Sequence, residues 1–283
     1  MIEILLAIFF ITVLLLFLSS GIWVAISMIG VSSIGMILFT SRPVGDAMAT
    51  TIWGASSSWT LTALPLFVWM GEILFRTKLS ENLFEGLAPW LQKLPGGLIH
   101  VNVVGCALFA AISGSSAATV ATVGKMSIPE LRKRKYPEKI LLGSLAGSGT
   151  LGLLIPPSII LIIYGVTVQE SIAKLFIAGI IPGIMIALIF MGYVIIWSLL
   201  NKNKMPLTEE NYSFLNKLSK SKQLIPVILL ILGVIGSIYT GIATATEAAS
   251  LGVVGALILS YFQKSLNLKT FKESLLGATK TSC

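Results

Sequence analysis

The sequence has 283 residues, of which 55% are hydrophobic and only 11% are charged. Together with a mean hydropathy of +0.92, this composition excludes an ordinary soluble domain and predicts an integral membrane protein. The net charge of +8 does not indicate a nucleic-acid partner, because the basic residues lie between apolar segments rather than along one soluble face.

The apolar segments, taken in chain order, predict an all-α protein that crosses the lipid bilayer several times. The first segment, 2–18, carries Glu3 where a secretory signal would carry Lys or Arg, and no cleavage site follows, so we expect a retained span. Residues 79–93 have apolar residues at helical spacing with polar breaks, which predicts a helix along the inner interface. Further spans are predicted at 22–39, 60–76, 138–167, 172–199, 224–240 and 245–262.

Residues 97–132 predict a re-entrant helical hairpin. Its apolar arms, 98–112 and 117–128, flank the sequence SGSS, and each is shorter than the about 20 residues that a full crossing requires. The backbone at the tip cannot face lipid, because unpaired N–H and C=O groups cost several kcal/mol there. We therefore expect the tip to lie inside protein or beside a cavity.

The segment after the hairpin, 138–167, is long enough to cross but is interrupted. Gly147, Gly149 and Gly152 are closely spaced in it, and Pro156 and Pro157 lie near its midpoint. Glycine lowers helix persistence, and proline removes a donor and clashes with the preceding turn. The pattern predicts two half-helices, 139–149 and 157–167, with proline in the first turn of the second.

Two broken elements near one depth are typical of a transporter site. Helix C-terminal ends favour a cation and N-terminal ends favour a carboxylate, while hydroxyl and backbone oxygens suit a hard cation such as sodium. The expected sodium site consists of Ser113, Gly114, Ser115, Ser116, Thr119, Ser148, Gly149 and Thr150. The expected contacts of a solute carboxylate are Ser116, Ala117, Pro156, Pro157 and Ser158.

Other interpretations of these breaks remain open. Small-residue runs in membrane helices often form close-packing faces, and the pairs Gly143/Gly147 and Gly179/Gly183 have that spacing. An ion channel could use the same broken helices, although no repeated filter motif is present in the sequence. A membrane-embedded enzyme would require a nucleophile and a base, and no such set lies at membrane depth, so no catalytic residue is expected.

Four further residues have ionisable or reactive side chains but belong to no recognisable motif. Glu72 and Glu247 are acids in membrane segments and so are functional suspects, but both lie near segment ends, where snorkelling or capping explains them equally well. Cys106 and Cys283 provide neither a disulfide framework nor the spacing of a metal site. No metal other than sodium is therefore expected.

The distribution of basic residues predicts the orientation. If the N-terminus lies outside the membrane, only Arg42 and Lys174 of the twenty basic residues fall on the outer side, as the positive-inside rule requires. The remaining eighteen are Arg76, Lys78, Lys93, Lys125, Arg132, Lys133, Arg134, Lys135, Lys139, Lys202, Lys204, Lys217, Lys220, Lys222, Lys264, Lys269, Lys272 and Lys280.

Five blocks of this sequence resemble the large membrane subunit of the tripartite ATP-independent periplasmic (TRAP) transporters. The ISGS and IPPS motifs are the most specific, and the order and spacing of the blocks agree over nearly the whole chain. The blocks are PLFVWMGEIL (65–74), the hairpin segment 96–136, GTLGLLIPPSIILIIYGV (149–166), LFIAGIIPGIM (175–185) and GIATATEAASLGVVGAL (241–257).

The resemblance implies an elevator-type secondary transporter with inverted repeats in a bacterial inner membrane, with the N-terminus periplasmic. It implies sodium as the coupling ion, no further cofactor, and a carboxylate-bearing solute such as a C4-dicarboxylate or sialic acid. It also implies two partners, which are a periplasmic solute-binding protein and a small membrane subunit of about four helices.

The family pattern also predicts how the chain is divided. Residues 1–199 are expected to form the first inverted half, 200–223 a cytoplasmic linker and 224–283 an incomplete start of the second half. Members of the family are about half as long again and contain a second hairpin, so the chain is expected to be truncated at its C-terminus. Many members carry Asp where this chain has Thr119.

Overall fold

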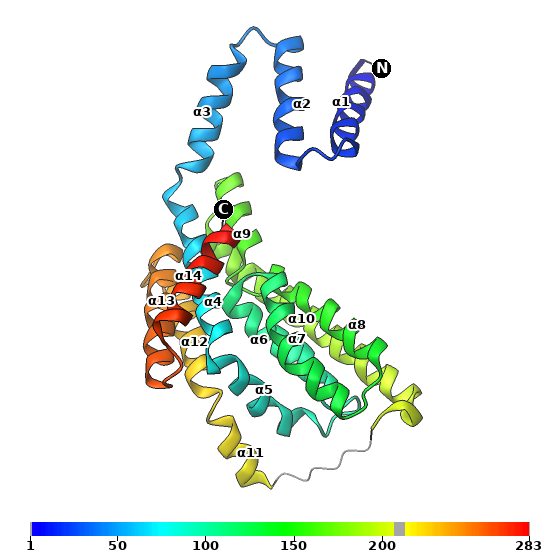
Figure 1. Cartoon of the computed structure of the whole chain (residues 1–283). Helices are drawn as coiled ribbons and strands as arrows, with labels where there is room; N and C mark the ends of the chain where they lie inside the picture. Colours follow the sequence, from blue (N-terminus) through cyan, green and yellow to red (C-terminus); the bar gives the residue numbers. More distant parts are fainter. Residues whose placement is uncertain (1, 207–212, 283) are drawn as a thin grey trace. The chain divides into compact units, whose positions relative to one another are not determined.

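The computed structural model describes residues 2–206 and 213–282, and every regular element in these ranges is helical (Figure 1). There are fourteen α-helices and three short 3₁₀ helices, and no β-strand occurs in the described ranges. The predicted all-α fold is therefore confirmed. The chain divides into two compact units, Met1–Ser57 and Ser58–Cys283.

The first unit contains three helices, α1 (Ile2–Ser19), α2 (Val24–Phe39) and α3 (Val44–Ser56). The first two lie at the predicted segments 2–18 and 22–39 but are short apolar helices, and Phe10 of α1 contacts Phe39 of α2 edge to face at 5.9 Å. Helix α3 was not predicted, because its sequence VGDAMATTIWGAS is too polar to be read as a span. It begins after Pro43, whose extended backbone (ψ 118°) precedes the first helical residue.

The second unit holds all the remaining elements. In chain order they are η1 (Trp59–Thr62), α4 (Ala63–Arg76), α5 (Lys78–Leu91), α6 (Ile99–Ser113), α7 (Ser116–Lys133), α8 (Glu138–Gly149), η2 (Thr150–Leu153), α9 (Ile159–Val168), α10 (Ile172–Leu200), η3 (Lys202–Lys204), α11 (Phe214–Ser221), α12 (Ile225–Tyr239), α13 (Ala245–Phe262) and α14 (Leu268–Ser282). Helices α6 and α7 form a helical hairpin in the predicted segment, and α8 and α9 correspond to the two predicted half-helices.

Some boundaries differ from the prediction. Helix α9 begins at Ile159, so Pro156 and Pro157 precede it and Ser158 takes the N-cap position with extended backbone. The expected proline in the first turn was therefore wrong. Helices α11 and α14 were not predicted, because both are amphipathic rather than continuously apolar.

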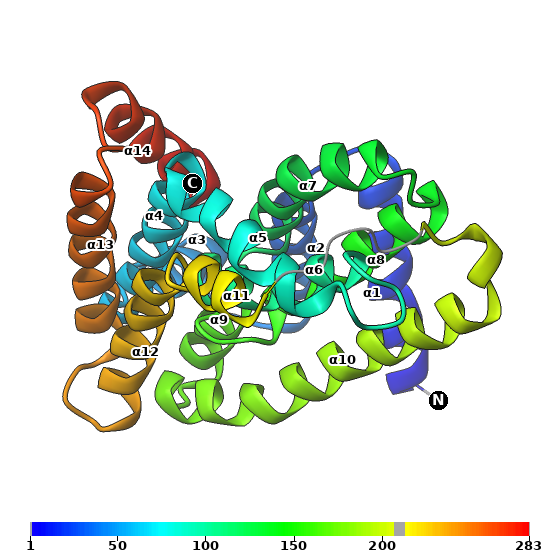
Figure 2. The same cartoon turned by 90° about the horizontal axis from the view of Figure 1, so that it is seen from below.

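Helix α4 organises the core of the second unit by packing against α13, α14 and α6 (Figure 2). Its apolar face buries Phe67, which meets Phe176 of α10 edge to face at 6.4 Å. Met70 lies so close to Gly252 of α13 that an added Cβ would sit 2.5 Å from its sulfur. Close helix contacts of this kind replace the hydrophobic driving force that is missing between helices in lipid.

Two described helices, α10 and α13, are long and apolar enough to cross a membrane. The number rises to four if each of two bent helix pairs is counted as one span. About half of the apolar side chains of α10 are exposed, among them Ile181 and Leu188. A large exposed apolar surface on a long helix is typical of contact with lipid or another membrane protein.

We predict that Phe67→Ala destabilises the chain, because it empties a fully buried ring site in the core. The expected loss is about 3–5 kcal/mol in the free energy of unfolding, measured in mixed detergent micelles. The matched control is Phe262→Ala. Phe262 is 76% exposed, so the loss of its ring should leave the free energy of unfolding nearly unchanged. Equal effects of the two changes would contradict the assigned core.

Candidate functional site

The tip of the hairpin is a tight turn between two helix ends. Helix α6 ends at Ser113, and Gly114 follows in the left-handed conformation with φ +60°. Ser115 is the N-cap of α7, and its hydroxyl accepts a hydrogen bond from the Ala118 N–H at 3.4 Å. Glycine adopts this conformation without the cost that a Cβ imposes, so the sequence SGSS encodes the turn directly.

The interrupted segment also brings two helix ends together. Helix α8 ends at Gly149 and continues as the 3₁₀ turn η2. The chain then becomes irregular until α9 begins, and the Ser158 hydroxyl closes this stretch by donating to the Leu153 carbonyl at 2.7 Å. This irregular stretch remains inside the protein, since Pro157 and Ser158 are both buried.

The hairpin tip and the interrupted segment pack directly on each other. The Ile159 N–H at the start of α9 donates to the Gly114 carbonyl at 3.2 Å. A Cβ added to Gly114 would lie 2.6 Å from the Pro157 carbonyl oxygen, and one added to Gly152 would lie 2.9 Å from the Ser116 nitrogen. We call the contact of 113–116 with 149–152 and 157–159 the tip contact.

Four helix ends therefore meet at the tip contact. The C-terminal ends of α6 and α8 carry the negative ends of their helix dipoles, which favours a cation. The N-terminal ends of α7 and α9 present N–H groups, which favour an anion. The residues that make the contact are uncharged, so the electrostatic character of the site comes from backbone dipoles and hydroxyl groups.

The hydroxyl groups around the tip contact are not all satisfied. Ser113 Oγ and Thr119 Oγ1 lie 3.0 Å apart and share a hydrogen bond. Ser116 Oγ and Ser148 Oγ are buried and have no hydrogen-bond partner. The Ser116 carbonyl oxygen lies 3.7 Å from the position of a Cβ on Gly149, the residue that follows Ser148. A buried hydroxyl without a partner costs roughly 1–3 kcal/mol and indicates room for a ligand or water.

Three of the predicted site residues, Thr150, Ala117 and Pro156, do not direct their side chains into this contact. Thr150 is exposed, and its hydroxyl donates to the Gly147 carbonyl of its own helix at 2.7 Å. Ala117 is also exposed. Pro156 faces α10, where a Cβ on Gly179 would lie 3.6 Å from its Cγ. Their side chains therefore do not contribute to the tip contact.

Comparison with known proteins identifies the family. Residues 11–283 match the tripartite ATP-independent periplasmic transporter, DctM component. The chain belongs to this family. The resemblance seen in the sequence is thereby confirmed.

Curated relatives of the TRAP family cover most of the chain. It is 33% identical over 253 residues to the C4-dicarboxylate TRAP transporter large permease protein of Pseudomonas aeruginosa, covering 89% of this chain and 58% of the relative. It is 34% identical over 271 residues to the isethionate TRAP transporter permease protein of Oleidesulfovibrio alaskensis, covering 94% of this chain and 42% of the relative. It is 34% identical over 268 residues to the sialic acid TRAP transporter permease protein of Haemophilus influenzae, covering 91% of this chain and 43% of the relative.

The chain spans about half the length of these TRAP relatives. They are named as transporter permeases, which confirms the prediction that the chain is not an enzyme. Family membership and the apolar helices together make it a multi-pass membrane protein.

The structure adds residues to the candidate TRAP site that sequence reasoning missed. Gly71 of α4 lies against the tip, because a Cβ there would be 2.8 Å from the Ser113 Cα. Val120 of α7 occupies the space beside Gly149, and Gly152 faces Ser116. The sequence signal was the pattern of single glycines in WMGEIL and GTLGLL, which mark close backbone approach.

The two membrane-region acids have structural partners. Glu72 accepts from Arg76 at 2.9 Å, and Arg76 also reaches Glu273 of α14 at 3.3 Å. Glu247 forms a capping box with Thr244, in which its carboxylate accepts from the Thr244 N–H at 2.8 Å. Capping therefore explains Glu247, and an ion pair with Arg76 within α4 explains Glu72.

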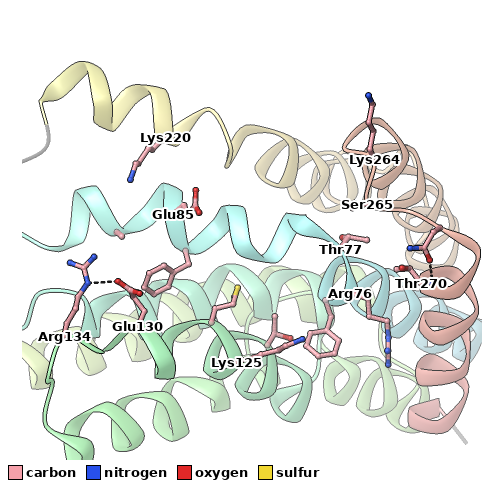
Figure 3. Close-up of a pocket in the computed structure, with 16 residues that line it drawn as sticks. Arg76, Thr77, Glu85, Lys125, Glu130, Arg134, Lys220, Lys264, Ser265 and Thr270 are labelled. Atoms are coloured by element: carbon pink, nitrogen blue, oxygen red, sulfur yellow. Dashed lines mark hydrogen bonds and ion pairs between the residues drawn. The ribbon is translucent and has the colours of Figure 1, made fainter. Parts of the chain in front are cut away.

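A cavity of about 840 Å³ lies away from the tip contact, between α4, α5, α7, α11 and the segment that joins α13 to α14 (Figure 3). Five basic and two acidic side chains line it. Arg134 is paired with Glu130 at 2.7 Å, Arg76 with Glu72, and Lys125 lies 5.7 Å from the ring centroid of Phe75. None of the predicted sodium or solute residues lines this cavity, and much of its charge is compensated.

We predict that Gly114→Ala destabilises the chain more than Gly241→Ala. Both glycines have positive φ, so both changes carry the cost of left-handed backbone, about 1–2 kcal/mol. Only Gly114 adds a collision, with the backbone of Pro157 and Ile159, whereas Gly241 has nothing within 4 Å. Thermal unfolding in detergent measures the difference, and equal losses would show that the tip contact is not close-packed.

Proposed function

We propose that this chain works within a sodium-coupled secondary transporter that imports an organic acid. Family membership supports the transporter class. The observation that carries the sodium proposal is the pair of buried hydroxyls without partners, Ser116 and Ser148, at a contact where two helix C-termini end. Oxygen ligands from hydroxyls and backbone carbonyls are what a hard cation prefers.

In this proposal the cation is held mainly by backbone oxygens. The carbonyl groups at the ends of α6 and α8 supply the negative ends of two helix dipoles, and the hydroxyls of Ser116 and Ser148 complete the ligand set. Ser113 and Thr119 hold the turn by their mutual hydrogen bond at 3.0 Å. Thr150 contributes only through its backbone, since its hydroxyl is bonded to Gly147.

The solute carboxylate is proposed to bind at the N-terminal ends of α7 and α9. The N–H groups near Ser116 and Ala117 and those after Ser158 suit an anion. Relatives named for C4-dicarboxylates, isethionate and sialic acid have nearly equal identity to this chain, at 33%, 34% and 34%. Identity therefore does not select one solute, and the proposal stays at the class of organic acids.

The proposed transporter includes partners and an orientation. A periplasmic binding protein would deliver the solute, and a small membrane subunit would cover part of the apolar surface. We propose an elevator mechanism with inverted halves, in which 1–199 form the first half and 224–283 belong to the second. The basic residues support placement in a bacterial inner membrane with the N-terminus in the periplasm.

We predict that sodium stabilises the chain against heat through the tip contact. At one hundred times its Kd, a bound ion adds about 2.7 kcal/mol to the unfolding free energy. The changes Ser116→Ala and Ser148→Ala should each weaken sodium binding at least tenfold while leaving sodium-free stability unchanged or higher, because each removes an unsatisfied hydroxyl. Thermal unfolding in NaCl against KCl of equal ionic strength measures both effects.

The control for the sodium experiment is Ser250→Ala. Ser250 is exposed, and its hydroxyl already donates to the Thr246 carbonyl at 3.0 Å. Its sodium response should match that of the unchanged chain. If the double variant Ser116→Ala with Ser148→Ala keeps the full sodium response, the ion does not bind at the tip contact.

We also predict the sidedness of four positions. In intact cells, a membrane-impermeant thiol reagent should label cysteines placed at Asp46 and Gln169, and should not label those at Lys133 and Lys220. The background would carry Cys106→Ala and Cys283→Ser. Periplasmic labelling of position 133 would mean that the α6–α7 hairpin crosses the bilayer rather than entering and leaving on the cytoplasmic side.

A further inference from the structure

Helix α11, Phe214–Ser221, carries an apolar face that is largely exposed. Phe214, Leu215 and Leu218 are 66%, 74% and 49% exposed. At 3.6 residues per turn these three side chains fall within an arc of about 100°. The same short segment carries Lys217, Lys220 and Lys222. An exposed apolar arc beside several lysines is the pattern of a helix that lies in a membrane interface.

The orientation of α11 is fixed by its contact with α5. Trp90 Nε1 donates to the Ser221 hydroxyl at 2.7 Å, the Lys217 ammonium lies 5.5 Å from the centre of the Trp90 ring, and Phe214 meets Trp90 edge to face at 6.4 Å. Both views show α11 beside α5 (Figures 1 and 2). The helix is therefore held along one side, where Phe214 meets Trp90, and Leu215 and Leu218 remain largely exposed.

The position of α11 along the chain sets its depth. It leads into the apolar helix α12 through a bend of 51°. Placing three lysines in the hydrocarbon region would cost about 2.5–3.5 kcal/mol each, so α11 does not extend the span of α12. Gly86 of α5 lies against Leu224 at the junction, where an added Cβ would be 2.5 Å from Leu224 Cγ, which holds the bend against α5.

We propose that α11 is an interfacial anchor that binds anionic phospholipid. Phe214, Leu215 and Leu218 insert at the boundary between headgroups and acyl chains, and the ammonium groups of Lys217 and Lys222 bind lipid phosphates. Lys220 points from α11 toward α5 in Figure 3 and lines the cavity described above. The proposal does not depend on sodium or on the solute, because α11 takes no part in the tip contact.

The test uses the chain with Leu215→Cys, Cys106→Ala and Cys283→Ser, carrying a nitroxide label at position 215. It is reconstituted in nanodiscs of phosphatidylcholine alone or with about 30% phosphatidylglycerol. Collision rates with oxygen and with a water-soluble nickel chelate should place the label about 5–10 Å into the interface in the anionic discs, and shallower in the neutral discs. Inorganic phosphate added to neutral discs should not deepen it.

A charge variant isolates the role of the lysines. Lys217→Gln, Lys220→Gln and Lys222→Gln together should abolish the difference between the two lipids, whereas Lys133→Gln, Lys135→Gln and Lys139→Gln, which remove the same charge from the α7–α8 region, should preserve it. Native mass spectrometry should show phosphatidylglycerol affinity falling about fivefold per α11 lysine removed.

Two results would overturn the proposal. If the chelate reaches position 215 freely in both lipids, α11 does not lie in the bilayer interface and its apolar arc faces water or another protein. If the label lies equally deep in both lipids, α11 binds the interface without preference for anionic lipid. The unchanged lysines in this labelled chain make both readings independent of how the charge variant folds.

Discussion

The structure depends on one constraint, which is that backbone polar groups at an interrupted helix must find partners away from water. Both breaks in this chain meet that requirement by contacting each other. The Gly114 carbonyl at the end of α6 accepts a hydrogen bond from the Ile159 N–H at the start of α9. A backbone acceptor at one break is thus paired with a backbone donor at the other. A buried break without such partners would cost several kcal/mol for each unpaired group.

Some polar groups at the tip contact still have no hydrogen-bond partner after the two breaks have packed together. The glycines let the two backbones approach within van der Waals contact, and the hydroxyls of Ser113 and Thr119 pair with each other. What remains unpaired is the pair Ser116 and Ser148, beside two helix C-termini. A contact beside unpaired hydroxyl oxygens is suited to a small cation, and the adjoining N-termini are suited to an anion.

Much of this arrangement could be predicted from the sequence. The length of the arms beside SGSS and the glycines before Pro156 predicted both breaks, since span length and proline chemistry act locally. The start of α9 at Ile159 could not be predicted, because the Ser158 bond to Leu153 that sets it is a contact across the irregular stretch. The contact of Gly71 with Ser113 could not be predicted either, because it forms only when α4 packs on α6.

The absence of ionisable side chains among the described residues of the tip contact has a consequence for proton chemistry. A carboxylate in such a place would take up a proton as the medium became acidic, and the proton would compete with any metal ion for the same oxygens. Carbonyl and hydroxyl oxygens do not protonate in the biological range. A cation held there would be bound with an affinity independent of pH, and a proton could not replace it as the driving ion at these residues.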